Sequence, residues 1–419
     1  MAQTPLTIMI GADTYPPDVN GAAQFGVRLA TAMHGRGHNV HVVVPNDVAG
    51  ESETRDVNGI TEHRLHSHKV ITHEYLRLCA PWEIYREIGD ILDAVQPDVV
   101  HIQCHWLIGR VLAHQASRRG IRVIATNHVM PENIAPFLPL PQFLQGPFAK
   151  ISWWDMAGGV RQPPGGSYFQ AQVVTTPTPI AVEAMSASGA FKRPALAVSN
   201  GIEIGDYELA PGESVDKNPG ELRIFFAGRL AVEKHIDVLI RALSLLPDSL
   251  SNVVLEIAGD GEQREKLHKL VAELGVENRV RFLGYVSDEE LRAGYLRADV
   301  FCQPGTAELQ SLVTLEAMSA SLPVVLADAL ALPHLADEGV NGYLFAPGNA
   351  QDLAEKLELV LSLPEKERQA MGNASKVMVD MHRAETTWEI FESLYTSNLY
   401  YNQRRRELAS SSASYTQKF

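Results

Sequence analysis

The sequence is poor in the features that mark secreted and membrane-spanning proteins. Its 419 residues include three cysteines, Cys79, Cys104 and Cys302, which are odd in number and far apart. They predict no disulfide framework and favour a reducing, cytosolic compartment. No apolar stretch reaches the roughly 18 residues that a membrane span needs, and the start has no basic segment like that of a signal peptide. We therefore expect a cytoplasmic protein that does not cross a bilayer.

Positive charge is also scarce. The chain has 36 Lys and Arg residues against 50 Asp and Glu, which makes a net charge of −14. Residues 1–200 are nearly balanced, with 15 basic and 16 acidic side chains, whereas the remainder has 21 and 34. Because nucleic-acid binding depends on basic groups that neutralise phosphates, this composition argues against a nucleic-acid partner. The nearly neutral first half can still approach an anionic membrane through local basic clusters.

The length and the patterning predict two domains. A chain of 419 residues suits two domains of about 200 residues, each able to bury its own core. Short β-branched runs alternate with helical patterns, and the alternation restarts after a linker rich in Gly, Pro and acidic residues, which is typical of βαβ units. We predict an α/β fold class with two Rossmann-like, doubly wound parallel sheets. Its parts are domains over 1–200 and 201–385, a C-terminal helix over 386–408 and a disordered tail over 409–419.

The stretch from Phe301 to Ala317 (FCQPGTAELQSLVTLEA) predicts an anion site. Its pattern indicates a strand end, a Pro-Gly turn, a polar loop that contains Glu308, and a helix that begins near Leu312 and contains Glu316. The first backbone N–H groups of that helix, including those of Leu312 and Val313, have no partner within the helix. Together with the helix dipole they favour an anion such as a diphosphate.

A second segment carries two cations next to a predicted strand end. Arg229 follows the strand, and Lys234 falls in the first turn of a helix expected from about Glu233 (FAGRLAVEKHIDVLI). The helix dipole disfavours a cation at this position, so the pair indicates an anionic partner. Two solvated side chains are the alternative.

Glycines occur in two strand-to-helix loops. Gly21 begins a helix after the loop from Asp13, where a glycine either lets a phosphate approach the backbone or serves the turn. Gly259-Asp260-Gly261 indicates a turn that is mainly structural. No Gly-x-Gly-x-x-Gly is present in these loops, which argues against a dinucleotide fold for hydride transfer.

Histidines follow or end several strands of the first half. For His101 and His105 a site role and a satisfied position near a strand end are both open, and His128 follows the next strand. Four histidines form a second group: His63, His66, His68 and His73. We predict that they lie on a solvated strand and loop and are not a metal site.

An apolar stretch from Pro136 to Trp154 has Lys150 as its single charge. This stretch either inserts into a membrane interface or forms a groove for acyl chains, or else it packs in the protein interior. A basic cluster precedes this stretch and consists of Arg118, Arg119 and Arg122. It either binds lipid headgroups or is a solvated helix end.

The joint pattern resembles glycosyltransferase family 4, a group of retaining enzymes with the GT-B fold. A more local run, TNHVMPEN from Thr126 to Asn133, is similar to the subgroup that glycosylates diacylglycerol and related glycolipids. The features that carry the wider resemblance occur in the family's order: the Gly21 loop, His128, Asn200-Gly201-Ile202, Arg229, Lys234 and the pair Glu308 and Glu316. The family often has Gly-Gly where this chain has Asn20-Gly21.

The resemblance implies a donor site for a GDP- or UDP-hexose in the second domain, an acceptor site in the first, and chemistry in the cleft between them. It also implies that the C-terminal helix crosses back to the first domain. The donor-binding residues it implies are Gly21, Arg229, Lys234, Val286, Glu308, Leu312, Val313 and Glu316. The residues it implies at the reacting centre are His128, Glu308, Arg229 and Lys234.

In that scheme, cations and helix amides hold the diphosphate, Glu316 binds the ribose hydroxyls and Glu308 binds the sugar near C3. The base meets backbone groups near Val286, and His128 contacts the donor sugar. No Asp-x-Asp occurs in the chain, so the carboxylate pair by which many metal-dependent sugar transferases hold a divalent ion is missing, and we expect no metal.

The predicted reaction is transfer of mannose or glucose to a membrane glycolipid or diacylglycerol-type lipid at the inner face of the cell membrane. Three alternatives are open: a soluble acceptor, a sugar-nucleotide 2-epimerase with the same layout, and a two-lobed sugar-binding protein. The oligomeric state is open as well.

Overall fold

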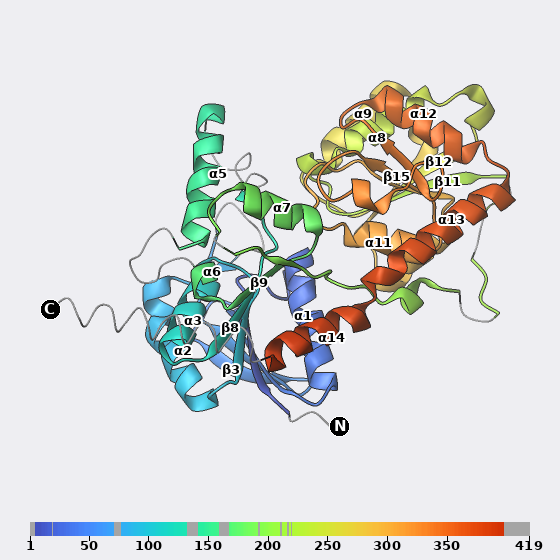
Figure 1. Ribbon diagram of the computed structural model, residues 1–419. Helices are drawn as coiled ribbons and strands as arrows, with labels where there is room; N and C mark the ends of the chain where they lie inside the picture. The colour runs from blue at the N-terminus through green and yellow to red at the C-terminus, as the bar shows by residue number, and fades with distance from the viewer. Residues whose placement is uncertain are drawn as a thin grey trace. The chain divides into compact units, whose positions relative to one another are not determined.

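The described residues form two compact units (Figure 1). Unit 1 contains residues up to Ser199 and from Thr387 onward, and unit 2 contains Asn200–Thr386. The computed structural model describes residues 5–18, 20–70, 77–131, 141–158, 167–191, 193–209, 212–215, 218 and 220–397. The tail predicted over 409–419 and the last part of the helix predicted over 386–408 lie outside these residues.

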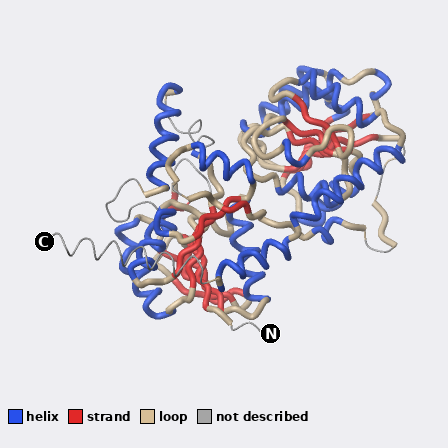
Figure 2. Tube along the Cα trace, in the orientation of Figure 1, coloured by secondary structure: helices blue, strands red, loops and turns tan. Residues whose placement is uncertain are grey.

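Unit 1 is built on an eight-stranded sheet with helices on both faces, visible in the secondary-structure colours of Figure 2. The strand order is β10-β9-β8-β7-β1-β2-β4-β3. The strands are β1 (Thr7–Gly11), β2 (Asn39–Pro45), β3 (Glu53–Val57), β4 (Ile60–Leu65), β7 (Val99–Ile102), β8 (Arg122–Thr126), β9 (Val173–Thr176) and β10 (Leu196–Ala197). A separate ribbon pairs β5 (His68–Lys69) with β6 (Arg77–Leu78).

The first sheet is parallel, as predicted, except for one strand pair at its edge. β3 runs antiparallel to β4, whereas the other strand pairs in this sheet are parallel. The reason is a tight hairpin: Asn58 and Gly59 join the two strands with φ of 54° and 83°. Asn-Gly accepts two positive φ angles at low cost, which favours a two-residue hairpin turn.

The helices of unit 1 include a C-terminal segment that packs on the first sheet. From Thr387 onward this segment buries Trp388, Phe391 and Tyr395, and the Phe391 ring lies 5.1 Å from that of His101 on β7. The helices are α1 (Gly21–Gly35), α2 (Pro81–Val95), α3 (Leu107–Arg118), α5 (Gln142–Met156), α6 (Ser167–Gln170), α7 (Pro179–Ala187) and, from Thr387 onward, α14 (Ala384–Thr396).

Unit 2 has a six-stranded sheet in the order β13-β12-β11-β14-β15-β16, with parallel neighbours throughout. Numbered within the unit, this is the Rossmann order 3-2-1-4-5-6. All six residues of β12 are buried, as expected for a strand covered on both faces. The strands are β11 (Leu222–Ala227), β12 (Val253–Ala258), β13 (Val280–Gly284), β14 (Val300–Gln303), β15 (Val324–Ala327) and β16 (Gly342–Phe345).

The helices that cover this sheet begin at recognisable caps. Ser287 and Glu290 form a reciprocal capping box at α10, and the side chain of Asn349 accepts hydrogen bonds from the first amides of α12. The helices are α8 (Ile236–Leu245), α9 (Arg264–Leu274), α10 (Asp288–Arg297), α11 (Leu312–Ser319), α12 (Ala350–Leu361) and α13 (Glu365–Val379). Within the described ranges, every helix is too short or too polar to span a bilayer.

Candidate functional site

The point in unit 2 where the strand order reverses lies between β11 and β14. In open α/β sheets, ligands bind at such a point, beyond the carboxyl ends of the strands. The chain after β11 contributes Lys234, and the chain after β14 contributes Glu308. The Lys234 ammonium donates a hydrogen bond to Oε1 of Glu308, and both side chains are largely shielded from solvent. Two residues predicted from separate segments therefore meet at this point.

The position of Lys234 differs from the prediction. It ends a short 3-10 helix, η3 (Val232–Lys234), and the α-helix begins only at Ile236. His235 separates the two helices with φ of 49° and ψ of 38°, a left-handed conformation that is uncommon for a residue other than glycine. Nε2 of His235 lies 3.0 Å from Oγ1 of Thr306, which ties the turn to the loop after β14.

Arg229 lies beside the same turn. Its guanidinium donates to Oε1 of Glu233 at 2.7 Å, and the Arg229 side chain is 54% exposed, so the cation is accessible to a ligand. Close backbone packing positions this loop. A Cβ at Gly259 would lie 1.9 Å from the carbonyl oxygen of Gly228, and one at Gly261 would lie 2.6 Å from that of Leu230. The glycines of the Gly259-Asp260-Gly261 turn thus have the structural role that we predicted.

The helix α11 begins at Leu312, as predicted, with Glu308 in the preceding loop and Glu316 within the helix. Its N-cap residue, Ser311, makes no side-chain capping bond to the helix backbone. The Ser311 hydroxyl instead accepts a hydrogen bond from Oγ1 of Thr314 at 2.8 Å. Because the cap does not occupy the first-turn amides, these N–H groups can serve an anion.

The second carboxylate is oriented by a buried tyrosine. The hydroxyl of Tyr295 on α10 donates to Oε2 of Glu316 at 2.7 Å. Burial and the neighbouring Glu316 carboxylate raise the pKa of Tyr295, so the hydroxyl stays protonated and can donate. Val286 lies half-buried in the short connection between β13 and α10, next to Tyr285, whose side chain is 77% exposed.

Sequence reasoning missed Gln303 at the end of β14. Its side chain is fully buried, Oε1 accepts from the Gly305 amide at 3.2 Å, and Nε2 has no hydrogen-bond partner among the described residues. A buried unpaired amide donor is costly unless something else binds it. A Cβ at Gly305 would lie 3.4 Å from Oε1 of Glu308, which shows how close this loop comes to the carboxylate. A glutamine that ends an otherwise apolar strand was the available signal.

In unit 1, His128 follows β8 and contacts a residue that follows β7. Nε2 of His128 donates to Oε1 of Gln103 at 2.8 Å, and its ring lies 5.0 Å from that of Phe25. Burial lowers the pKa of His128 to about 4. The imidazole is therefore neutral at pH 7, and with Nε2 protonated its Nδ1 is a hydrogen-bond acceptor.

Of the two alternatives for His101, a site role or a hydrogen-bonded position near a strand end, the structure supports the second. Its Nδ1 lies 2.6 Å from the hydroxyl of Tyr395 and its Nε2 lies 2.7 Å from Oγ1 of Thr126. Burial lowers its pKa to about 3. His105 is also buried, with its ring edge-on to those of Trp106 and Tyr168. Burial lowers the pKa of His105 to about 3 as well.

The loop before α1 shows why Gly21 is of interest. The side chain of Asn20 caps the helix by accepting from the Ala23 amide at 2.9 Å. Gly21 is the first helical residue, has no positive φ, and a Cβ added there would meet nothing within 4 Å. Neither the backbone conformation nor the packing requires a glycine at this position. Earlier in the loop, Asp13 is buried and accepts a hydrogen bond from the Ile108 amide at the start of α3.

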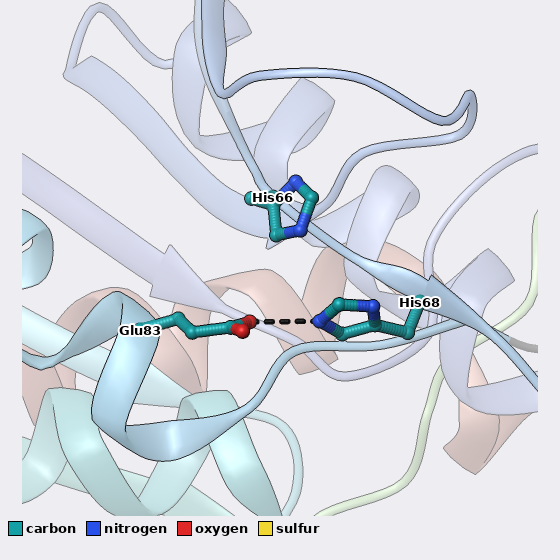
Figure 3. A group of neighbouring side chains, drawn as sticks. All are labelled: His66, His68 and Glu83. Atoms are coloured by element: carbon teal, nitrogen blue, oxygen red, sulfur yellow. Dashed lines mark hydrogen bonds and ion pairs between the residues drawn. The ribbon is translucent and has the colours of Figure 1, made fainter.

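The group of histidines at β4 and β5 is only partly solvated. His63 is buried, with Nε2 3.1 Å from Nδ1 of His41, so the prediction of a solvated position was wrong for this residue. His66, His68 and Glu83 lie near one another, and the dashed line in Figure 3 marks a hydrogen bond between Glu83 and His68. Nε2 of His68 lies 2.8 Å from Oε2 of Glu83. Their candidate ligand atoms all lie within 4.8 Å of one another, and His68 and Glu83 are exposed. That this group is not a metal site stays a prediction. His73 lies outside the described residues.

The predicted basic cluster is mostly engaged in structural contacts. Arg119 forms two hydrogen bonds of 2.7 Å with Asp93. Arg122 is buried and donates to the carbonyl oxygen of Tyr395. Only Arg118 of the three is an exposed cation, so these residues are not a shared lipid-headgroup site.

Comparisons with known proteins cover most of the chain. Residues 213–378 match the family described as glycosyl transferases group 1, and residues 19–205 match the one described as glycosyltransferase family 4. An uncharacterized glycosyltransferase of Methanocaldococcus jannaschii is 27% identical over 369 residues, which are 83% of this chain and 87% of that protein. A GDP-mannose-dependent alpha-mannosyltransferase of Mycolicibacterium smegmatis is 28% identical over 331 residues, 77% of this chain and 80% of its own.

Solved structures show the same fold. Anabaena HepE in complex with UDP and glucose has a TM-score of 0.69 at 18% identity, covering 94% of this chain and 100% of its own. Sucrose-phosphate synthase from Thermosynechococcus elongatus has a TM-score of 0.72 at 16% identity, covering 97% and 100%. The predicted α/β fold class, GT-B with two Rossmann-like units, is confirmed.

Proposed function

We propose that this chain, which belongs to glycosyltransferase family 4, moves a hexose from a nucleoside diphosphate sugar to an acceptor with retention at the anomeric carbon. The observation that carries the proposal is the ion pair between Lys234 and Glu308 at the reversal point of the unit 2 sheet. It puts a cation and a carboxylate together where sheets of this type bind ligands. In a sugar nucleotide, the phosphates can bind the cation and the sugar hydroxyls can bind the carboxylate.

The diphosphate is assigned to Arg229, Lys234 and the first amides of α11. Arg229 is accessible, and the cap of α11 leaves the amides of Leu312 and Val313 to a ligand. Charge-assisted hydrogen bonds contribute roughly 1.5–3 kcal/mol each, so several of them supply a substantial part of the about 8 kcal/mol or more that an enzyme needs. Glu308, already next to Lys234, is assigned to the sugar hydroxyls near C3.

The nucleoside is assigned to the other end of α11. Glu316 binds the two ribose hydroxyls as an acceptor, and the hydroxyl of Tyr295 holds the carboxylate in place. Backbone groups near Val286, where β13 ends, meet the base. Because backbone groups are the same at every residue, the side chains do not reveal which base is preferred.

In the reaction, the bond between the anomeric carbon and the diphosphate oxygen breaks, and the nucleoside diphosphate takes the electron pair. The acceptor oxygen forms its bond on the same face of the sugar and gives its proton to the departing phosphate. Lys234, Arg229 and the amides stabilise the negative charge on the leaving group. His128, neutral at pH 7, positions the sugar through hydrogen bonding and does not serve as an obligatory base.

No metal has a role in this proposal, because two cations and helix amides neutralise the diphosphate. The relatives favour two donors. The name of the Mycolicibacterium smegmatis protein specifies GDP-mannose, and the Anabaena HepE complex contains UDP and glucose. We propose a GDP- or UDP-hexose.

The acceptor we propose is a membrane glycolipid or a diacylglycerol-type lipid. The support is the similarity of the run that begins at Thr126 to glycolipid-forming enzymes, together with an apolar surface described below. A soluble acceptor is the alternative within the same reaction class.

Two measurements test the function. Thermal unfolding with UDP, GDP and ADP reports which nucleotide binds, because a ligand that binds the folded state raises the melting temperature. Turnover of the preferred sugar nucleotide is then followed with and without diacylglycerol. Consumption only with acceptor supports the proposal, and consumption of donor alone indicates a 2-epimerase. Nucleotide binding without turnover in either condition contradicts the lipid acceptor and indicates a soluble acceptor or a binding protein.

A further inference from the structure

One helix of unit 1 exposes apolar side chains where a helix of a globular protein normally exposes polar ones. Residues Gln142–Met156 form α5 (QFLQGPFAKISWWDM), which projects from the rest of unit 1 in Figure 1. Phe143 is 77% exposed, Ile151 63% and Trp154 52%, and Leu144 is exposed as well. Their spacing, with Pro147 between them, places them along one side of the helix.

The opposite side of α5 is already packed. Ala149, Trp153 and Met156 are buried at the spacing of one helix face, and the ring of Trp153 lies edge-on to that of Phe191 at 5.9 Å. Asp155, the single acidic residue of the helix, forms an ion pair with Arg110. The exposed apolar side is therefore additional to the face that holds α5 in the fold.

We propose that α5 docks the protein on a lipid bilayer by lying in its interface with this side inserted. The surface comprises Phe143, Leu144, Pro147, Lys150, Ile151 and Trp154. This inference rests on the proposed function and deepens it. The exposed side of α5 is the surface by which the enzyme reaches a lipid acceptor.

Charge and chemistry favour a bilayer over a protein partner. Lys150 is the one charged residue on the exposed side of α5, and no carboxylate accompanies it. An anionic headgroup layer complements a lone lysine beside apolar anchors, and tryptophan is enriched at the membrane interface. Fifteen residues of helix span only about 22 Å, less than the about 30 Å of a hydrocarbon core, so α5 can lie in the interface but not cross it.

The test is co-sedimentation of the full chain with vesicles of phosphatidylcholine and of equal parts phosphatidylcholine and phosphatidylglycerol. The expected result is binding to both, stronger with phosphatidylglycerol. Phe143→Glu and Ile151→Glu are each expected to weaken binding about tenfold or more, because burying one such side chain is worth about 1.5–3 kcal/mol. Lys150→Gln is expected to weaken only the binding to anionic vesicles, by about fivefold.

The matched control is Val377→Glu on α13 of unit 2, since Val377 is also 77% exposed. It is expected to bind vesicles like the wild type. Binding of UDP and GDP by calorimetry is expected to be unchanged in all these variants, which separates failure of membrane docking from failure of the donor site. A wild type that does not bind vesicles, or a Phe143→Glu variant that binds them as well as the wild type, would overturn the inference. So would a wild-type dimer that Phe143→Glu dissociates in the absence of lipid, because a second copy would then be the occupant.

Discussion

In unit 2, the ammonium group of Lys234 donates a hydrogen bond to the carboxylate of Glu308, a residue 74 positions further along the chain. The contact joins the loops that follow β11 and β14, the two strands between which the sheet order reverses. A cation paired with a carboxylate at this point can exchange part of that pairing for a phosphate without moving far. The donor-site predictions depend on this relationship.

Replacing Lys234 by alanine is expected to lower turnover by roughly 10² to 10³, as loss of one preorganised charge donor does in other enzymes. The measurement is the steady-state rate with saturating sugar nucleotide, and the matched control is Lys266→Ala, an exposed lysine of α9. Thermal unfolding of both variants checks that the fold is retained. Wild-type turnover in Lys234→Ala would remove this residue from the site.

Replacing Glu316 by alanine is expected to weaken binding of the nucleoside diphosphate, because the ribose hydroxyls lose their acceptor. Tyr295→Phe keeps the buried ring but removes the hydroxyl that holds Glu316, so it is expected to weaken the same binding by a smaller factor, about fivefold. Calorimetric titration with UDP and GDP measures both. Unchanged affinity in Glu316→Ala would contradict the ribose assignment.

Gly21→Ala separates a ligand role from a structural one. The fold has room for the new Cβ, and alanine favours a helix over glycine by no more than about 1 kcal/mol, so the melting temperature is expected to stay level or rise. If a phosphate approaches the backbone here, turnover is expected to fall. Gly35→Ala at the other end of α1 is the control, since it also meets open space. Equal activity of the two variants would show that no ligand approaches the backbone at Gly21.

The stability of the protein is expected to fall as the pH is lowered from 6.5 toward 4. Burial lowers the pKa of His101 to about 3 and of His128 to about 4, below the ordinary value of 6.5 that each regains on unfolding. In this window the unfolded chain binds more protons, so the free energy of unfolding is highest above pH 6.5 and decreases below it. Thermal unfolding across this range measures the effect.

Two carboxyl groups act against this trend, Asp13 and Asp18, because burial raises the pKa of each. Burial raises the pKa of Asp13 to about 6, so its protonation in the folded state adds stability as the pH falls through that value. Histidines with a lowered pKa outnumber these two carboxyls, because burial also lowers the pKa of His63 and His382 to about 4. The net slope is therefore expected to follow the histidines, and a melting temperature that rises toward pH 4 would contradict it.

Removal of divalent ions with EDTA is expected to leave turnover unchanged, because Arg229, Lys234 and the helix amides neutralise the diphosphate in the proposed site. The rate is measured before and after dialysis against the chelator. Loss of activity that Mg²⁺ or Mn²⁺ restores would show that a metal takes part.

Much of unit 2 could be predicted from local patterns. The alternation of strands and helices after the linker and the start of α11 at Leu312 match the predictions, because buried β-branched runs and a polar loop before a helix are local signals. The place of Lys234 was predicted incorrectly, because the left-handed His235 delays α8 and has no local sequence signal comparable to glycine. Gln303 was missed because its burial depends on the neighbouring strands.

The sequence by itself determined the alternation of strands and helices, the two Rossmann-like units and the family resemblance, since periodicity depends on residues close together in the chain and the order of motifs follows the chain whatever its fold. Only the tertiary structure decided which side chains meet. His101 is bonded to Tyr395, the hydroxyl of Tyr295 holds Glu316, and α5 keeps an apolar side exposed. These contacts join segments that are distant in sequence, and the burial that shifts a pKa or leaves an amide unpaired exists only after those segments have packed.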